Sequence, residues 1–317
     1  MMTFRKFTIV NMSVASVIMT LLFTVNFVVD PYNFNNIFDF DLRKNVISKS
    51  KNYRLWKLSD LSRKSKSYVI LGDSRSGNLE EIYFERLGVE GVYNLGYGGG
   101  TLSEAIDSFW IAAGNNKLEK VIFGVPFSLF NESNNLNLLL EAKDVMDNPF
   151  KYYLSSFTFS ASSMNIYDKY IGRVAQEVPP MNKEAFWRHQ LEGVTNGYYS
   201  TYVYPDRSLM KLKEISEYCA EMGIEFIFFI PPTHVDLQSR VADFSLTREY
   251  SLYKDDLCKI ANVIDFDYLN KVTASKDNFT DPYHFNEKIA IKIVEEIVND
   301  TQFFSKRCEI KEVESII

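Results

Sequence analysis

Short apolar runs and helical apolar repeats alternate along the chain from about residue 67 onward. The apolar runs predict strands, at 68–71, 91–95, 121–125, 224–230 and 263–266. The segments between them predict helices, at 79–87, 102–113, 137–146, 208–222, 247–260 and 284–298. Because strands and helices alternate, the pattern predicts a doubly wound α/β domain with a parallel sheet. Such sheets bind ligands beyond the carboxyl ends of their strands.

The N-terminal segment has a different pattern. Residues 7–29 carry no charge, and a helix needs about 20 apolar residues to span a bilayer. Arg5 and Lys6 precede the run, which favours a cytoplasmic N-terminus. No small-x-small cleavage site follows it. We therefore expect residues 1–30 to be an uncleaved signal anchor in the lipid bilayer, with the rest of the chain outside the cytoplasm. A buried helix of a soluble protein is the alternative.

The remaining boundaries follow from where the alternation begins and breaks. Residues 31–66 are mixed and polar, and predict a linker or a cap. The α/β domain is expected over 67–300, interrupted by an insertion at about 150–205, and 301–317 is expected to be a C-terminal tail. Aromatic residues are frequent in the insertion, which suggests either a glycan-facing lid or an aromatic core of its own. They are Tyr152, Tyr153, Tyr167, Tyr170, Trp187, Tyr198, Tyr199, Tyr202 and Tyr204.

Composition and charge exclude several classes of protein. The chain has 317 residues, of which 46% are hydrophobic, enough for a large core. The formal net charge of −6 is spread along the chain and argues against nucleic-acid binding. The three cysteines match no metal-binding spacing, and a single disulfide or three free thiols are both open. Asp, Glu and His do not cluster with ligand spacing either, so we expect no metal and no cofactor.

Candidate chemistry begins at Gly72-Asp73-Ser74-Arg75, which follows the strand at 68–71. Near the C-terminus, Asp281 and His284 stand three residues apart before the last predicted helix. Serine needs a neighbouring base to become a nucleophile, and histidine suits that task at neutral pH. An acidic residue then orients the imidazole. Ser74, His284 and Asp281 are therefore predicted to form a catalytic triad for acyl hydrolysis or transfer.

Three further features surround this prediction. The glycine-rich segment 94–100, with Gly96, predicts an oxyanion donor beside the backbone N–H of Ser74. It lacks the full spacing of a dinucleotide-binding loop. His234 follows the strand at 224–230, so it could contact substrate, compete as the base or lie in a solvated turn. The Gly-Asp-Ser tripeptide on its own would also fit a turn with a helix N-cap.

Taken together, these blocks resemble the SGNH/GDSL hydrolase superfamily over about 66–130 and 208–298. The matching blocks are Gly-Asp-Ser, Asn-x-Gly-x-x-Gly and Asp-x-x-His. The resemblance implies a flavodoxin-like three-layer sandwich, with Ser74 as nucleophile, Gly96 as oxyanion donor, and Asp281 and His284 completing the triad. The fourth block, usually Gly-x-Asn-Asp, reads Gly124-Val-Pro-Phe-Ser128 here. The missing oxyanion donor would then be Asn131, Asn94 or the side chain of Arg75.

Arg75 after the serine, the N-terminal span and the Asp-Pro-Tyr at 30–32 narrow the resemblance. They are similar to membrane-anchored SGNH proteins that modify polymers, such as alginate O-acetyltransferases and the D-alanyl transfer protein of teichoic-acid synthesis. This implies acyl transfer, most simply of acetyl, to or from a cell-surface or secreted glycan. Arg75 and, from its position after a strand, His234 are the candidate substrate-binding residues. It also implies a membrane-bound O-acyltransferase partner. A noncatalytic glycan-binding scaffold and a lipase or lysophospholipase are the alternatives.

Overall fold

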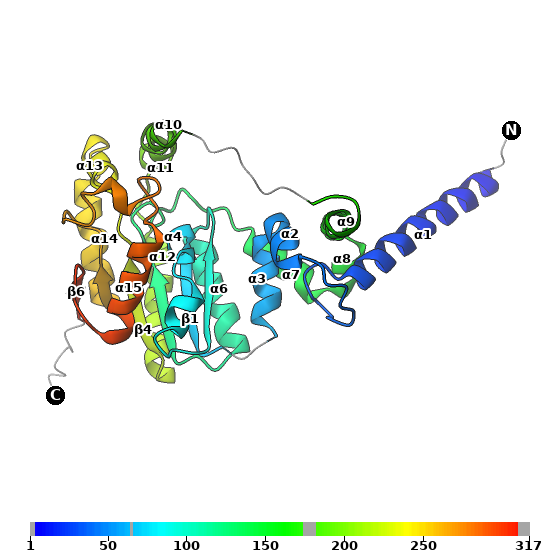
Figure 1. The fold of residues 1–317 in the computed structure, drawn as a ribbon, viewed down its shortest axis with the longest axis horizontal. Helices are drawn as coiled ribbons and strands as arrows, with labels where there is room; N and C mark the ends of the chain where they lie inside the picture. Colours follow the sequence, from blue (N-terminus) through cyan, green and yellow to red (C-terminus); the bar gives the residue numbers. More distant parts are fainter. Residues whose placement is uncertain (1–3, 64–65, 174–181, 310–317) are drawn as a thin grey trace. The chain divides into compact units, whose positions relative to one another are not determined.

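The computed structural model describes residues 4–63, 66–173 and 182–309. The chain folds into two compact units. The first unit combines residues 1–64 with 138–178, and the second combines 65–137 with 179–317. Each unit therefore contains segments that are far apart in the sequence (Figure 1).

The second unit is built on a six-stranded sheet with the strand order β2-β1-β3-β4-β5-β6. The strands are β1 Tyr68–Asp73, β2 Val92–Tyr97, β3 Lys120–Gly124, β4 Glu225–Ile230, β5 Asn262–Asp265 and β6 Lys306–Cys308. The first five pair in parallel, and β6 is antiparallel to β5. The prediction of a mixed α/β fold with a mostly parallel sheet is confirmed. The edge strand β6 was not predicted, since it is too short for an alternating pattern and lies in the expected tail.

Successive residues of a strand point to opposite faces of the sheet. In the second unit both sets are buried, so helices cover both faces of the sheet. Ile70 and Ile122 share one cluster with Ile293 of α15 (Glu287–Asn299). Leu71 and Phe123, one position on, are also fully buried. Helices α6 (Leu102–Asn115) and α12 (Asp206–Met222) pack against β1 and β4. In Figure 1, α15 and α6 lie on opposite sides of β1.

Six further helices complete the part of this unit that the structure describes. They are α4 Ser74–Gly77, α5 Glu81–Glu85, α10 Lys183–His189, α11 Thr195–Ser200, α13 Val235–Asp243 and α14 Thr247–Ile260. A π-helical turn, η1 (Gln190–Val194), joins α10 to α11, and a 3₁₀ turn, η2 (Lys276–Asn278), precedes the loop that carries His284.

The first unit is helical. Its helices are α1 Phe4–Val29, α2 Lys44–Lys51, α3 Tyr53–Leu61, α7 Leu139–Asp147, α8 Pro149–Leu154 and α9 Ser156–Tyr170. The structure adds detail to one of the expected segments and divides another. The segment expected as a linker or cap forms α2 and α3, which pack with α9 and α7. The expected insertion at 150–205 is divided, because its part up to 178 joins this unit and the rest joins the second.

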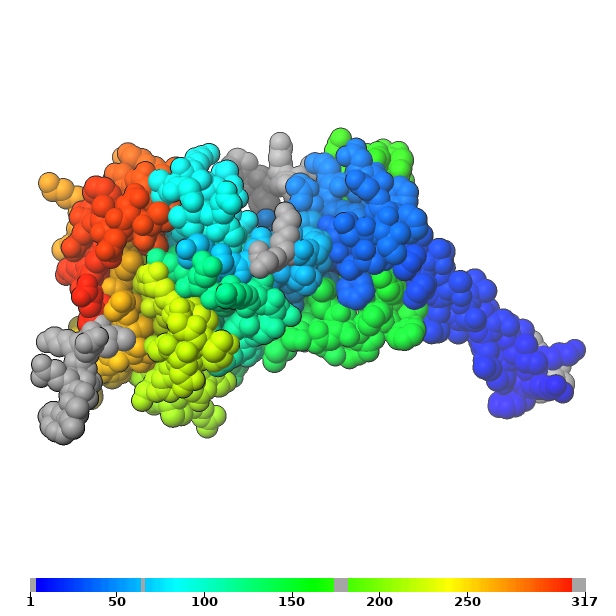
Figure 2. Space-filling view, turned by 90° about the horizontal axis from the view of Figure 1, so that it is seen from below, coloured from blue at the N-terminus to red at the C-terminus, as the bar shows by residue number. Residues whose placement is uncertain are grey.

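Helix α1 is long and apolar enough to cross a membrane, with 26 residues and a mean hydropathy of 2.1 in its best window. At about 1.5 Å per residue it would extend roughly 39 Å, more than the ~30 Å hydrocarbon core of a bilayer. Signal sequences have the same length and apolarity. Most of its side chains are exposed, and its blue atoms project from the rest of its unit in Figure 2.

The C-terminal end of α1 is different, because it belongs to the core of its unit. Asn26 is fully buried, and its side-chain Nδ2 donates to the carbonyls of Tyr153 (2.9 Å) and Ser155 (3.3 Å). Its Oδ1 accepts a hydrogen bond from the Ser162 hydroxyl at 2.9 Å. All three hydrogen bonds involve helices α8 and α9 or the residue between them. The last turn of α1 is therefore fastened to a folded structure.

Asp30, directly after α1, is a second buried clamp. Its carboxylate accepts hydrogen bonds from the backbone N–H groups of Phe34 (2.7 Å), Asn35 (3.0 Å) and Asn36 (2.8 Å). The hydroxyl of Tyr152 donates to the same carboxylate at 2.8 Å. A buried carboxylate needs such donors to offset its lost hydration. Tyr152 is thus a structural aromatic residue of this unit.

We expect Asp30→Asn to destabilise the first unit by about 2 kcal/mol, because an amide N–H₂ would face two hydrogen-bond donors at whichever oxygen it replaced. Asparagine tolerates the left-handed backbone of Asp30 (φ 45°), so backbone strain would not confuse the result. Hydrogen exchange of the Asn35 and Asn36 amides in the detergent-solubilised full chain should accelerate roughly 30-fold if they exchange through this opening. The exposed Asp39→Ala is the control, and unchanged exchange in Asp30→Asn would contradict the clamp.

Candidate active site

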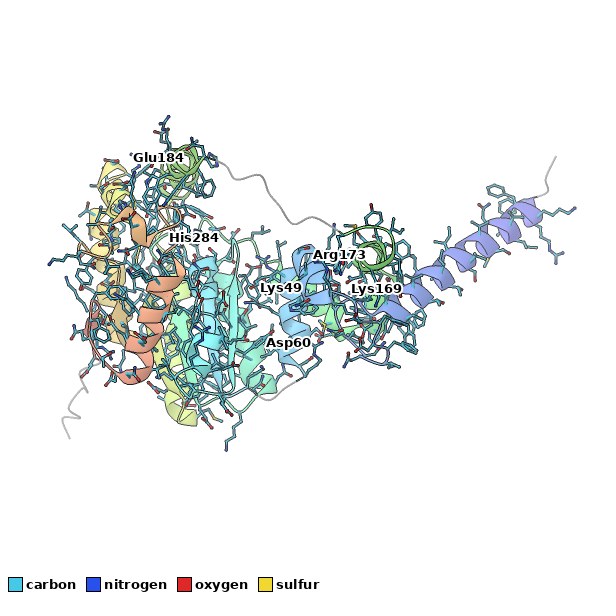
Figure 3. The ribbon with its side chains drawn as sticks, in the orientation of Figure 1. Lys49, Asp60, Lys169, Arg173, Glu184 and His284 are labelled. Carbon is cyan, nitrogen blue, oxygen red and sulfur yellow. The ribbon has the colours of Figure 1, made fainter. Side chains whose placement is uncertain are left out.

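The structure brings Ser74, His284 and Asp281 together. Ser74 Oγ lies 2.7 Å from His284 Nε2, and His284 Nδ1 lies 2.7 Å from Asp281 Oδ2. The other carboxylate oxygen, Oδ1 of Asp281, accepts the backbone N–H groups of Tyr283 (2.8 Å) and His284 (3.1 Å). Figure 3 labels His284, which lies at the end of the sheet where β1 passes into α4. The sequence predicted these neighbours, and this arrangement permits proton transfer from the serine to the imidazole.

Ser74 reaches this position through a tight turn from β1 into α4. Gly72 has φ 131°, and a Cβ there would lie 2.4 Å from Ser76 Oγ and 2.7 Å from the Gly124 carbonyl oxygen. Asp73 then caps α4 by accepting the backbone N–H of Arg75 at 2.9 Å. Because only glycine fits at 72, the strand can turn sharply and present the Ser74 hydroxyl beyond the sheet.

The loop of Asp281 and His284 is held by its own backbone and by a neighbour. The Thr280 N–H donates to the His284 carbonyl at 2.9 Å, and the His234 N–H donates to the Pro282 carbonyl at 2.9 Å. These two hydrogen bonds involve the residues directly before and after Asp281, so they restrict the backbone of the loop. The imidazole is therefore presented to Ser74 from a fixed backbone.

A cavity of about 220 Å³ opens beside Ser74 and His284. Gly99 and Gly100 line it, as do Arg75 and Tyr283. Tyr198, one of the aromatic residues of the expected insertion, lines it too. Five further lining residues were missed by the sequence reasoning: Ser128, Leu129, Asn134, Gln190 and Val194. Gln190, Val194 and Tyr198 recur every four residues. This spacing places them on one face only if their segment is helical, which the sequence did not predict.

Arg75 is buried beside the nucleophile and is already paired. Its guanidinium donates to the Asp73 carboxylate through Nε (3.0 Å) and Nη2, and Nη2 also donates to Ser128 Oγ (2.8 Å). It lies over the ring of Tyr283, 5.4 Å from the centroid. Burial lowers the pKa of Arg75, but the charge and hydrogen bonds of Asp73 outweigh it and the pKa is raised. Arg75 therefore stays charged and braces the cavity wall, and its contact with substrate stays a prediction.

The structure corrects the expected oxyanion donors. The Gly96 N–H donates to Asn94 Oδ1 at 2.8 Å, and Asn94 Nδ2 donates to the carbonyls of Ser76 and Leu79, both at 2.8 Å. Gly96 is glycine for a packing reason, since a Cβ would lie 2.4 Å from the Gly77 nitrogen. Neither Gly96 nor Asn94 lines the cavity, so these two bind α4 to β2 instead.

Asn131 does not replace the missing donor either. Its Nδ2 donates to the Tyr198 carbonyl at 3.0 Å, and its Oδ1 accepts the N–H groups of Ser133 (3.1 Å) and Val203 (3.0 Å). With both ends of the amide engaged, Asn131 joins the loop after β3 to the end of α11. Sequence spacing could not distinguish this structural amide from a catalytic one.

His234 was expected to contact substrate, to compete as the base or to lie in a solvated turn, but the structure buries it outside the lining of the cavity. It is 3% exposed, its Nδ1 accepts the Asp236 N–H at 3.1 Å as the N-cap of α13, and its ring meets Trp187 and Phe279 edge-on. It does not line the cavity. Burial lowers the pKa of His234, which favours the neutral ring.

The aromatic residues of the expected insertion are mostly structural. Tyr199 and Tyr202 pack on the ring of Phe127, and the Tyr204 hydroxyl donates to Asp256 at 2.7 Å. Of the nine aromatic residues named above, Tyr198 lines the cavity. Most of these residues therefore pack in the interior, whereas Tyr167 and Tyr170 are exposed and Tyr198 lines the cavity.

Metal-binding side chains do not gather at this site. Within residues 4–63, 66–173 and 182–309, no three His, Cys, Asp or Glu side chains are placed to hold a metal ion. The cysteines Cys219, Cys258 and Cys308 are free thiols.

Comparison with known proteins adds little. No family model matches the chain, and no curated protein matches it. Among solved structures, it is similar to a "putative acylhydrolase" from Bacteroides fragilis, with 11% identity over 79% of this chain and 97% of that one, at a TM-score of 0.38. It is also similar to a "putative platelet activating factor" from Streptococcus pneumonia, with 10% identity over 81% and 95%, at a TM-score of 0.40. At these TM-scores, neither likeness bears on the function.

We expect His234 to make the protein less stable in acid. Because its pKa is lowered in the folded state, its stabilising effect is complete above its unfolded pKa of about 6.5 and is lost as the pH falls below that. His234→Asn keeps an N-cap acceptor but cannot be protonated. The melting temperature should therefore drop less in His234→Asn than in the wild type between about pH 7.5 and pH 5. Equal drops in both proteins would contradict this role.

Proposed function

We propose that the chain is a serine acyl hydrolase or acyltransferase. The observation that carries the proposal is the chain of hydrogen bonds from Ser74 through His284 to Asp281, both of 2.7 Å, at the mouth of a cavity. His284 would accept the proton of Ser74 as Oγ attacks an acyl carbonyl. Asp281 would hold the imidazole with its proton on Nδ1 and stabilise the imidazolium that forms.

The reaction would proceed in two steps, acylation of Ser74 and deacylation. The tetrahedral intermediate collapses as His284 returns the proton to the leaving alcohol, and the acyl group stays on Ser74 as an ester. Water or another hydroxyl then gives its proton to His284 and attacks that ester. As the bond between the acyl carbon and Ser74 Oγ breaks, His284 returns the proton to Oγ, which restores the free serine. The oxyanion would be stabilised by backbone N–H groups of Ser74, at the start of α4, and of Gly99, which lines the cavity with a left-handed backbone (φ 63°).

The cavity suggests a small acyl group and a polar acceptor. Its lining near Ser74 is rich in glycine backbone and polar side chains, with Leu129 and Val194 as its aliphatic residues. A lipase would need a long apolar channel for an acyl chain, and this lining does not favour one. We therefore propose acetyl as the acyl group and a glycan of the cell surface or a secreted glycan as the substrate.

Helix α1 is proposed to anchor the protein in the membrane without being cleaved. The support is the buried Asn26 in the last turns of α1, since cleavage after α1 would remove this residue from the core of its unit. Arg5 and Lys6 at its start favour a cytoplasmic N-terminus and an extracytoplasmic site. A membrane-bound O-acyltransferase that supplies the acyl group is a further proposal, and it derives from the sequence resemblance alone.

The catalytic role of the triad is tested with the full-length protein in detergent. We expect labelling of Ser74 by a fluorophosphonate and hydrolysis of p-nitrophenyl acetate. Ser74→Ala, His284→Ala and Asp281→Asn should each lower kcat by about 10³-fold or more, because each removes a partner in one proton relay. The exposed His189→Ala is the matched histidine control and should keep full activity.

If the folded wild type neither labels nor releases acetate, the enzyme proposal fails. A noncatalytic glycan-binding protein would then be favoured, consistent with the altered block at 124–128.

Transfer and hydrolysis share the acyl-enzyme and differ in the second acceptor. We expect methyl glucoside, added with p-nitrophenyl acetate, to yield acetylated glucoside detectable by mass spectrometry. The product should be absent in Ser74→Ala. Release of acetate alone, at every glucoside concentration, would identify a hydrolase.

A further inference from the structure

One wall of the cavity comes from a single helical segment, 183–200, made of α10, η1 and α11. This segment contributes Gln190, Val194 and Tyr198 to the lining. All three are partly buried, whereas Glu192 and Asn196 between them are exposed. The segment therefore turns one face to the cavity and the other to solvent.

The π-helical turn brings these three residues onto that face. An α-helix rotates about 100° per residue, so Tyr198 would lie roughly 80° around the axis from Gln190. A π-turn holds one more residue than an α-helical turn, so the angle accumulated between Gln190 and Tyr198 is smaller by roughly 100°. The two side chains are then nearly aligned. Such turns are frequent at functional sites because they redirect side chains.

Thr195 holds this turn in place. Its hydroxyl donates to the Gln190 carbonyl at 2.8 Å, and it lies 2.8 Å from the Tyr283 hydroxyl. Tyr283 stands next to His284 in the loop of the triad. Burial raises the pKa of Tyr283 to about 12, so its hydroxyl keeps its proton at neutral pH. The wall is therefore attached directly to the loop that positions the proposed base.

The polar groups on this side of the cavity are available for a ligand. Asn134, from the loop after β3, lines the cavity with Gln190 and Tyr198. Within the described part of the chain, the carboxamides of Asn134 and Gln190 and the Tyr198 hydroxyl make no hydrogen bond. Two carboxamides and a phenol offer both donors and acceptors, which suits hydroxyl groups rather than an anion. Val194 adds an apolar surface and Tyr198 a ring face, against which a sugar ring can pack.

We propose that Gln190, Tyr198 and Asn134 form a subsite for the sugar residue that carries or receives the acyl group. The proposal rests on the proposed function and deepens it by assigning the substrate-selecting residues. Val194 packs against the sugar ring, and the π-turn sets the register of the wall. These residues bind the sugar in the ground state and in the transition state alike, so their loss raises KM more than it lowers kcat.

The test compares two esters. Methyl 6-O-acetylglucoside carries a sugar, and p-nitrophenyl acetate does not. We expect Gln190→Ala and Tyr198→Phe to lower kcat/KM for the sugar ester about 5- to 10-fold each, chiefly through KM, because each removes a hydrogen bond. Hydrolysis of p-nitrophenyl acetate should change by less than about 2-fold. Glu192→Gln, on the solvent side of the same segment, should leave both unchanged.

Two results would overturn the subsite. An equal loss on both esters would mean that the wall is only structural, and no loss on the sugar ester would mean that it does not meet the sugar. Saturation-transfer NMR of methyl 6-O-acetylglucoside with Ser74→Ala measures binding without turnover. If Ser74→Ala binds the glucoside and the added Gln190→Ala raises its Kd about 5- to 10-fold, the subsite stands even where the wild type shows no hydrolysis. Failure of the catalytic proposal is thereby distinguished from failure of the subsite.

Discussion

The close approach of backbone and side chain at the end of β1 is the constraint on which the site depends. The Ser76 hydroxyl fills the space beside Gly72 and Gly124, and a Cβ at Gly124 would lie 1.9 Å from it. A Cβ at Gly96, on the neighbouring strand β2, would lie 2.4 Å from the nitrogen of Gly77 in α4. These contacts allow α4 to begin immediately after β1, with its first residue, Ser74, beyond the sheet. A side chain at Gly72, Gly96 or Gly124 would require the turn to shift, and the nucleophile with it.

Other elements converge on this turn through a few buried polar contacts. Arg75 links α4 to the loop after β3 through Ser128, and it contacts the ring of Tyr283 in the triad loop. Tyr283 meets Thr195 of the helical wall. Satisfied buried networks of this kind specify a single arrangement, because each unpaired group would cost free energy. The proposed nucleophile, base and sugar subsite are thus positioned by one connected set of contacts.

In the first unit, buried polar residues have a similar role at a helix end. Asn26 and Asp30 are polar residues at the boundary between an apolar helix and a folded unit. Each has several hydrogen-bond partners, which offsets the cost of burial. An apolar segment that was only a targeting signal would not require these contacts. The proposed membrane helix is therefore a structural part of its unit.

The sequence by itself determined what depends on local chemistry. The alternation of strands and helices follows from apolar periodicity, and Asp281 and His284 face one point because three residues separate them on one loop. The position of Ser74 after a strand was legible for the same reason. Only the tertiary structure decided the roles of Gly96, Asn94 and His234, because their partners come from neighbouring elements. It also decided the division of the insertion and the lining by Gln190 and Tyr198. These features depend on which distant segments pack together. The pattern of apolar and polar residues indicates where each helix or strand lies, but not which residues of different segments come into contact.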